Sequence, residues 1–158
     1  TRTTTAVTLS MPPFVFAIPA GWVVDEAPDA LAVVRTPEKV DDFWVNALIS
    51  HDRVARSVDL EAAAKVTWTR IERESPGATI GMERVARFGD NVVYLRGIQM
   101  ESPQTKRALA QIHGLFLAPS PDEAKTADVF QIIGTAPADV MPTFGAVFVA
   151  LIASFQFV

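Results

Sequence analysis

The chain has 158 residues, of which 49% are hydrophobic and 20% charged, with a formal net charge of -4 and no cysteine. This length suits one domain, and the composition excludes an intrinsically disordered chain. The negative charge argues against a general nucleic-acid binder, and the lack of cysteine excludes disulfides, thiolate metal sites and cysteine nucleophiles. We therefore expect residues 1–158 to form a single domain.

The first ten residues, TRTTTAVTLS, lack the basic start and the continuous apolar segment of a secretory signal. Either no leader preceded them or it has been removed, and residues 1–6 are expected to form a disordered tail. Val7, Leu9 and Met11 alternate with polar residues, which favours a strand that Pro12 and Pro13 interrupt.

An extended segment is predicted from Phe14 to Ile18, followed by a corner. Pro19 ends the segment because it has no amide hydrogen to donate, and Gly21 permits a tight reversal. Trp22 can then fold its ring back over the apolar residues. This motif is interpreted as architectural.

Two further strands are predicted at residues 30–35 and 43–50, separated by the turn-rich TPEKVDD. In the second of these, Trp44 and Leu48 occupy one face. The other face carries Phe43, Val45, Ala47 and Ile49. Apolar residues on both faces predict a central strand that is covered on both sides.

The segment DLEAAAKVTWTRIERES predicts a helix that begins after Asp59, whose side chain can cap the first turn. Its apolar residues recur at helical spacing, its charged residues lie on the other flank, and Pro76-Gly77 ends it. Strands are then predicted at residues 78–88, 92–100, 108–117 and 129–133, with a hairpin turn at residues 89–91 and the polar PSPDEAKTAD before the last strand. Short turns between successive strands favour an antiparallel sheet and an α+β fold.

Residues 140–158, VMPTFGAVFVALIASFQFV, contain no charged residue. This is almost the length of a membrane-spanning helix, but Pro142, Gly145 and the absence of a basic flank argue against one. The apolar stripe favours a helix buried against the sheet, with Phe155 and Phe157 in a short closing strand. The stripe comprises Val140, Phe144, Val147, Phe148, Leu151 and Ile152.

No catalytic or metal-binding group is evident from residue spacing. Ser50, His51 and Asp52 cannot act as a triad, because consecutive strand residues point to opposite faces. His113 shares a strand face with leucines and is interpreted as a core or sheet-edge residue. The pairs Asp25-Glu26, Asp41-Asp42 and Asp122-Glu123 are interpreted as surface turns. There is no metal-binding motif and no glycine-rich phosphate loop, so we expect no metal and no cofactor.

The tryptophans are the candidate ligand-binding residues. Trp44 and Trp68 could line a groove between the sheet and a helix, where an apolar ligand could bind. Trp22 is more simply a plug for its turn. For all three, packing in the core is the competing interpretation.

Four segments carry a resemblance to a known family: FAIPAGWVVDE, WVNALIS, DLEAAAKVTWTRI and a closing helix that ends in SFQFV. Together they resemble the LpqN/LpqT family of secreted mycobacterial lipoproteins and antigens, whose fold is similar to that of PsbP and the Mog-type Ran-binding factors. The likeness spans nearly the whole chain and rests on turns and apolar runs.

This resemblance implies a six- to seven-stranded antiparallel sheet flanked by helices, in an α/β/α sandwich. It also implies export to the cell envelope, often with a tether through a lipidated cysteine, which this sequence lacks. Members of the family have no characteristic catalytic set and resemble binding or adaptor proteins.

Two hypotheses of function follow. The first is a non-catalytic, extracytoplasmic binding protein that engages an envelope lipid or a partner protein, but no nucleic acid, and associates with the membrane only if lipidated. Trp22, Trp44 and Trp68 are its candidate contact residues. The second is a small ligand-binding or enzymatic α+β barrel of the nuclear-transport-factor-like type, with His51 or His113 as a base beside a buried carboxylate.

Overall fold

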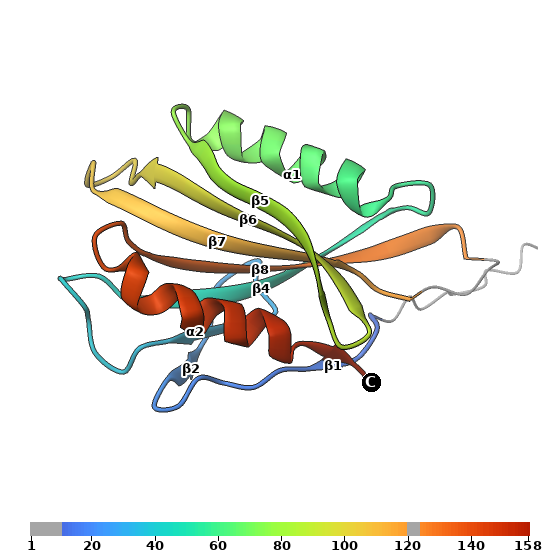
Figure 1. The fold of residues 1–158 in the computed structure, drawn as a ribbon, viewed down its shortest axis with the longest axis horizontal. Helices are drawn as coiled ribbons and strands as arrows, with labels where there is room; N and C mark the ends of the chain where they lie inside the picture. The colour runs from blue at the N-terminus through green and yellow to red at the C-terminus, as the bar shows by residue number, and fades with distance from the viewer. Residues whose placement is uncertain (1–10, 120–123) are drawn as a thin grey trace, which may run out of the picture.

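The computed structural model describes residues 11–119 and 124–158, which form nine strands and two helices (Figure 1). The helices are α1 (Leu60–Glu74) and α2 (Met141–Ser154). The strands are β1 (Phe14–Val15), β2 (Val23–Asp25), β3 (Ala32–Arg35), β4 (Asn46–Ala55), β5 (Thr79–Phe88), β6 (Asn91–Glu101), β7 (Ala108–Leu117), β8 (Thr126–Pro137) and β9 (Gln156–Phe157). The tail predicted at residues 1–6 and the predicted strand residues Val7 and Leu9 lie outside the described part of the chain.

Seven strands form one antiparallel sheet in the order β2-β3-β4-β8-β7-β6-β5, and β1 pairs with β9 in a separate small sheet. Helix α1 packs on one face, against β6 and β7, and α2 packs on the other face, against β7 and β8 (Figure 1). We call these the α1 face and the α2 face. The predicted α+β architecture with an antiparallel sheet flanked by helices is therefore confirmed.

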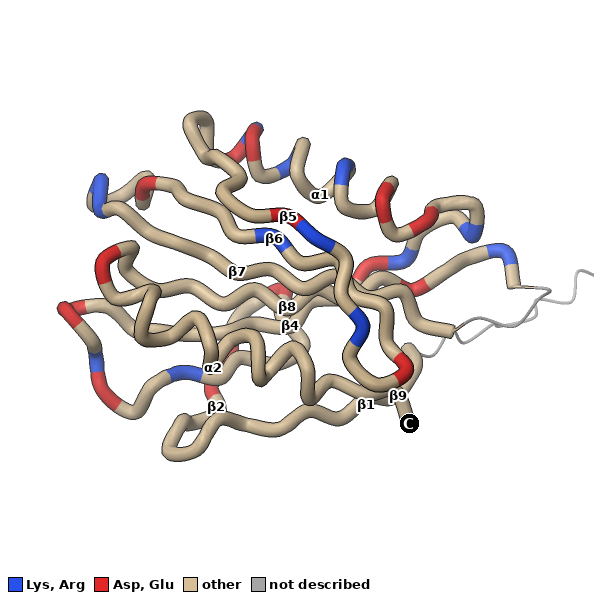
Figure 2. The backbone as a smooth tube through the Cα atoms, viewed as in Figure 1, with Lys and Arg blue, Asp and Glu red and all other residues tan. Residues whose placement is uncertain are grey.

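Helix α1 begins as the sequence predicts. The Asp59 side chain accepts a hydrogen bond from the amide of Ala62 at 2.8 Å, which satisfies one free donor of the first turn. Ala63 and Ala64 are buried, and the outer flank is charged. Figure 2 shows both acidic and basic residues along this helix. The helix therefore presents small residues to the sheet and charges to solvent.

Helix α2 carries no charged residue and lies directly on the sheet (Figure 2). Phe148, Leu151 and Ile152 are buried, and burying such side chains contributes roughly 1.5 to 3 kcal/mol each. Two glycines permit the close approach: a Cβ at Gly114 would lie 2.8 Å from Ile152, and one at Gly134 would lie 2.4 Å from Phe148. Among the described residues, no helix is long and apolar enough to span a bilayer.

The Pro-Ala-Gly-Trp corner forms the predicted turn, but its tryptophan packs against α2 rather than back over residues 14–18. The amide of Trp22 donates to the carbonyl of Pro19 at 3.0 Å, and Gly21 has a φ of 80°. A positive φ at the third position is what a type II turn requires. The Trp22 ring packs edge-on against Phe144 and Phe148, at centroid distances of 6.3 and 6.0 Å. The turn therefore closes one side of the core.

Several predicted boundaries are corrected by the structure. Strand β2 was not predicted, so Asp25 lies in a strand rather than a turn, where it pairs with Arg35 at 2.9 Å. The strand predicted at 43–50 begins at Asn46 and runs to Ala55, and the strand predicted at 129–133 extends over Thr126–Pro137. The pair Asp122-Glu123 lies outside the described residues.

The expectation that β4 is covered on both sides is wrong for one face. Its position inside the sheet is confirmed, and Val45, Ala47 and Ile49 are buried on the α2 face. On the α1 face, however, Leu48 and Ser50 are only partly buried, because α1 packs over β6 and β7. The uncovered part of the sheet contributes to the candidate site.

Candidate functional site

A groove of about 340 Å³ lies where α1 leaves the sheet uncovered. Its floor comes from β4 and β8, and one wall comes from the inner flank of α1. The residues that border it are Asp29, Ser50, His51, Asp52, Val54, Val58, Ala63, Val66, Thr67, Arg70, Val129 and Gln131. This volume is within the range of small-molecule sites.

The groove is amphiphilic. Valine and alanine side chains provide the apolar surface, at Val54, Val58, Ala63, Val66 and Val129. At the charged rim, Asp52 of β4 and Arg70 of α1 approach to 3.8 Å, with most of both side chains exposed. This exposed pair contributes little stability, so its charges are available to a ligand.

A buried polar network underlies the groove. Arg96 of β6 is 0% exposed and donates to three groups: the carbonyl of Ala64 at 2.8 Å, the hydroxyl of Thr67 at 2.8 Å and His113 Nδ1 at 3.3 Å. Burial lowers the pKa of Arg96, and this loss of hydration is partly offset by the nearby Tyr94 and Glu83. Because two of the acceptors belong to α1, the guanidinium fastens the helix to the sheet.

His113 is a core residue, as the sequence predicts. It is 1% exposed, and its pKa is lowered to about 3 by burial and by the charge of Arg96. Arg96 Nε can only donate, so His113 Nδ1 accepts and Nε2 donates to Gln111 at 2.8 Å. Gln131 joins the ring at 3.1 Å and also borders the groove. His113 therefore stays neutral and supports the floor of the groove.

His51 has a carboxylate partner that the sequence analysis missed. His51 Nε2 lies 2.6 Å from Asp128 Oδ1, and Asp128 also pairs with Arg53 at 3.3 Å. The His51 ring contacts Phe130 at a centroid distance of 4.9 Å. Phe130 belongs to the core under α2, so the ring lies on the α2 face although His51 borders the groove. Ser50 and Asp52 face the opposite way, as alternation requires.

The three tryptophans occupy separate surfaces. Trp22 lies beside α2, where it borders an apolar groove of about 480 Å³ with Ile18, Val147 and Leu151. Trp44 precedes β4, is 40% exposed and lies under the guanidinium of Arg35, 4.2 Å from its ring centre. Trp68 is on α1, partly buried, with Arg96 6.0 Å from its ring centre. Trp44 and Trp68 therefore lie on different elements of the described structure, beside different arginines.

The Arg96 network had a signal in the sequence, whereas the separate pair of His51 and Asp128 had none. In VVYLRGI, an arginine interrupts a buried strand, and such an arginine needs acceptors from a neighbouring element. The pair of His51 and Asp128 joins residues 77 positions apart, so no local pattern indicates it. Among the described residues, no group of histidine and acidic side chains could hold a metal ion.

No protein-family model matches the sequence, and no curated protein matches it. Among solved structures, the chain is similar to LpqN of Mycobacterium tuberculosis, a protein involved in cell envelope biogenesis, with a TM-score of 0.71 and 15% identity over 92% of this chain and 83% of that chain. It is also similar to the PsbP of Synechocystis sp. PCC 6803, with a TM-score of 0.61 and 11% identity over 98% of each chain.

A third similar structure is the Ran-binding protein Mog1p of Saccharomyces cerevisiae, with a TM-score of 0.57 and 11% identity over 91% of this chain and 89% of that chain. Likeness at such low identity is a likeness of fold. The chain therefore has the α+β fold that LpqN, cyanobacterial PsbP and Mog1p share.

Proposed function

We propose that this protein is an exported, non-catalytic binding protein of the cell envelope, related to the LpqN/LpqT lipoproteins, and that it holds an envelope lipid in the groove between α1 and the sheet. The amphiphilic groove carries the proposal, since its apolar walls suit a lipid chain and the rim formed by Asp52 and Arg70 suits a polar headgroup. Peripheral membrane association is proposed only for a lipidated form, because these 158 residues contain no cysteine.

The similar structures support the proposed location in the cell envelope and the proposed binding role. LpqN is involved in cell envelope biogenesis and has the same fold, which favours an extracytoplasmic role. Mog1p, which binds Ran, suggests that the fold can also hold a protein. We therefore also propose an adaptor role as the alternative to lipid binding, in which a partner protein binds the same open part of the sheet.

Blocking the groove should remove the bound lipid. Val66 borders the groove and is more than half exposed, so Val66→Trp can fill the groove without disturbing the core. We expect the lipid recovered with the exported protein from a mycobacterial host to fall about tenfold or more, because the added ring occupies the space that the lipid chain would fill. A tenfold fall corresponds to about 1.4 kcal/mol of binding free energy. Extraction followed by mass spectrometry measures it.

The matched control is Lys65→Trp. It adds the same ring to the neighbouring residue, which points away from the groove and is largely exposed. This variant should retain the wild-type amount of lipid. Lipid-free wild-type protein, or equal lipid in Val66→Trp and wild type, would contradict the proposal.

Tryptophan fluorescence should locate the ligand. Trp68 follows Thr67, which borders the groove, whereas Trp44 and Trp22 lie on other surfaces. Titration with envelope lipid should change the emission of the wild type and of Trp44→Phe, but the change should be largely lost in Trp68→Phe. Loss in Trp22→Phe instead would place the lipid in the apolar groove beside α2.

A second candidate function is supported by the pair of His51 and Asp128, since a carboxylate 2.6 Å from an imidazole can orient it as a base. This is the alternative of a small enzyme of the nuclear-transport-factor-like type. Its test is turnover of a panel of ester and phosphate substrates by the wild type and by His51→Gln. Activity that disappears in the variant would establish it and would replace the lipid-binding proposal.

A further inference from the structure

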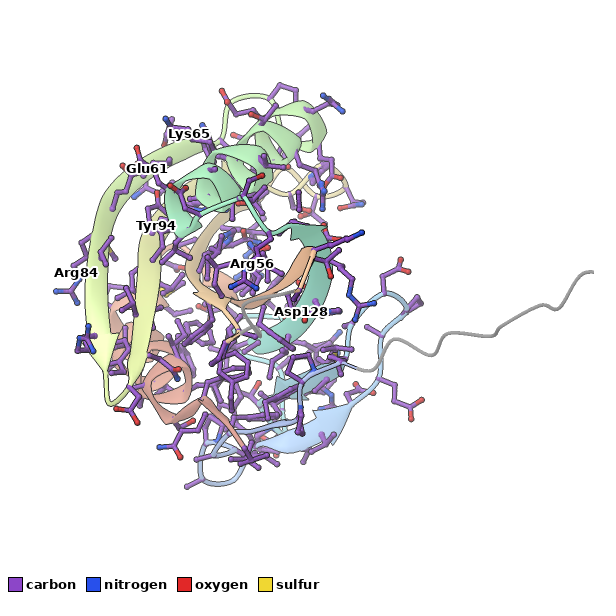
Figure 3. The ribbon with its side chains drawn as sticks, turned by 90° about the vertical axis from the view of Figure 1, so that its right-hand side faces the viewer. Arg56, Glu61, Lys65, Arg84, Tyr94 and Asp128 are labelled. Atoms are coloured by element: carbon purple, nitrogen blue, oxygen red, sulfur yellow. The ribbon has the colours of Figure 1, made fainter. Side chains whose placement is uncertain are left out.

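Strand β5 is a long, open edge of the sheet. It has ten residues, most of them exposed, and contains no proline, whereas the opposite edge strand β2 has only three residues. Figure 3 shows β5 as the outermost strand, with Arg84 projecting away from the sheet and no described segment beyond it. Proteins usually protect such an edge, because its unpaired backbone groups can bind another strand.

The hairpin turn determines which backbone groups of β5 point outward. Phe88 and Asn91 are paired across the two-residue turn Gly89-Asp90, and Gly89 has a φ of 60°. A tight turn of this type closes on a hydrogen-bonded pair, and antiparallel pairing alternates along the strand. The amide and carbonyl groups of Glu83, Val85 and Arg87 therefore point to the open edge.

These three residues are arranged symmetrically about Val85. If a second β5 pairs antiparallel about a two-fold axis at Val85, Glu83 of each copy lies opposite Arg87 of the other, and Val85 lies opposite Val85. Val85 is 64% exposed, so the contact would bury apolar surface. A shift of two residues in either direction removes both charge pairs, and one of these shifts brings Arg84 opposite Arg84.

The charged residues are available for this contact. In the described structure Arg84 and Arg87 make no ion pair. Glu83 uses one carboxylate oxygen to accept a hydrogen bond from the Tyr94 hydroxyl, and the pKa of Tyr94 is raised to about 12, so this donor keeps its proton. Because Tyr94 positions Glu83 and leaves its second oxygen for a partner, the carboxylate is preorganised at the edge.

We propose that two copies of this protein form a two-fold dimer through antiparallel pairing of their β5 strands about Val85, with Glu83 and Arg87 as reciprocal ion pairs. The two seven-stranded sheets then become one continuous sheet. The open part of the α1 face stays free in each copy, so dimerisation is independent of the ligand groove.

A disulfide trap tests the register. The chain has no cysteine, and hydrogen-bonded partners in an antiparallel pair have Cα atoms about 5.5 Å apart, which a disulfide can bridge. Val85→Cys should form a disulfide-linked dimer under mild oxidation. Val24→Cys is the matched control, since Val24 is 63% exposed on the other edge strand, and it should remain mainly monomeric. Equal cross-linking of the two variants would overturn the proposal.

Charge exchange tests the ion pairs. Glu83→Arg and Arg87→Glu should each weaken the dimer about tenfold in sedimentation experiments, because each places two like-charged pairs across the axis. Arg87→Glu leaves the Tyr94 contact intact, and the double variant should restore the wild-type affinity to within about threefold. Arg84→Glu is the control of equal charge and should have little effect. A monomeric wild type at about 100 μM, or a double variant without restoration, would refute the dimer.

Discussion

The free energy of unfolding should fall by roughly 2 to 3 kcal/mol between about pH 7 and about pH 4.5 because of His113 alone, and His113→Gln should remove this part of the pH dependence. Burial and the Arg96 charge lower the pKa of His113 from 6.5 to about 3. Between these values the unfolded chain binds a proton that the folded protein does not bind. Stability is therefore unaffected by this group above about pH 6.5 and decreases as the pH falls below it.

Urea unfolding of the wild type and the variant over a series of pH values measures this difference. Glutamine can accept from Arg96 and donate to Gln111, so the variant should keep the network of hydrogen bonds. The carboxylates titrate in both proteins, and only the histidine differs. Parallel pH profiles for the two proteins would show that His113 binds a proton equally well in the folded and unfolded states, which would contradict the prediction.

Gly134→Ala should destabilise the protein by roughly 1 to 3 kcal/mol, since overpacking a dense core forces side chains from their rotamers. A Cβ at this position would lie 2.4 Å from two ring atoms of Phe148, which is 1% exposed and cannot move aside. Thermal and urea unfolding measure the loss.

Gly81→Ala is the matched control, because a Cβ at Gly81 meets no atom within 4 Å and the position has no positive φ. This variant should be close to the wild type. Adding Phe148→Leu to Gly134→Ala should recover part of the lost stability by removing the ring atoms in conflict. If the two glycine variants are equally stable, the close packing of α2 on the sheet is wrong.

Local patterns predicted the elements whose causes are local. The cap at Asp59, the hairpin turn at Gly89 and the apolar stripe of α2 each depend on residues within a few positions of one another. The turn at Gly21 was predicted for the same reason. Short β2 was missed, since three residues paired to a neighbouring strand leave little periodicity in the sequence.

The candidate site was harder to predict because it is assembled from distant segments. The pairing of β4 with β8 brings His51 to Asp128, and the position of α1 over β6 and β7 both buries Arg96 and leaves the groove open. The sequence left open whether Trp44 and Trp68 line a groove or pack in the core, and only their three-dimensional positions show that they lie beside different arginines.

By itself the sequence determined the α+β class, both helices, most of the strands and the lack of a recognisable catalytic motif, because composition and hydrophobic period report what each segment must bury. Only the tertiary structure decided the strand order, the network around Arg96 and His113, the groove beside α1 and the open edge at β5. These depend on which segments meet in space, and contacts between distant residues leave no periodic trace in a single sequence.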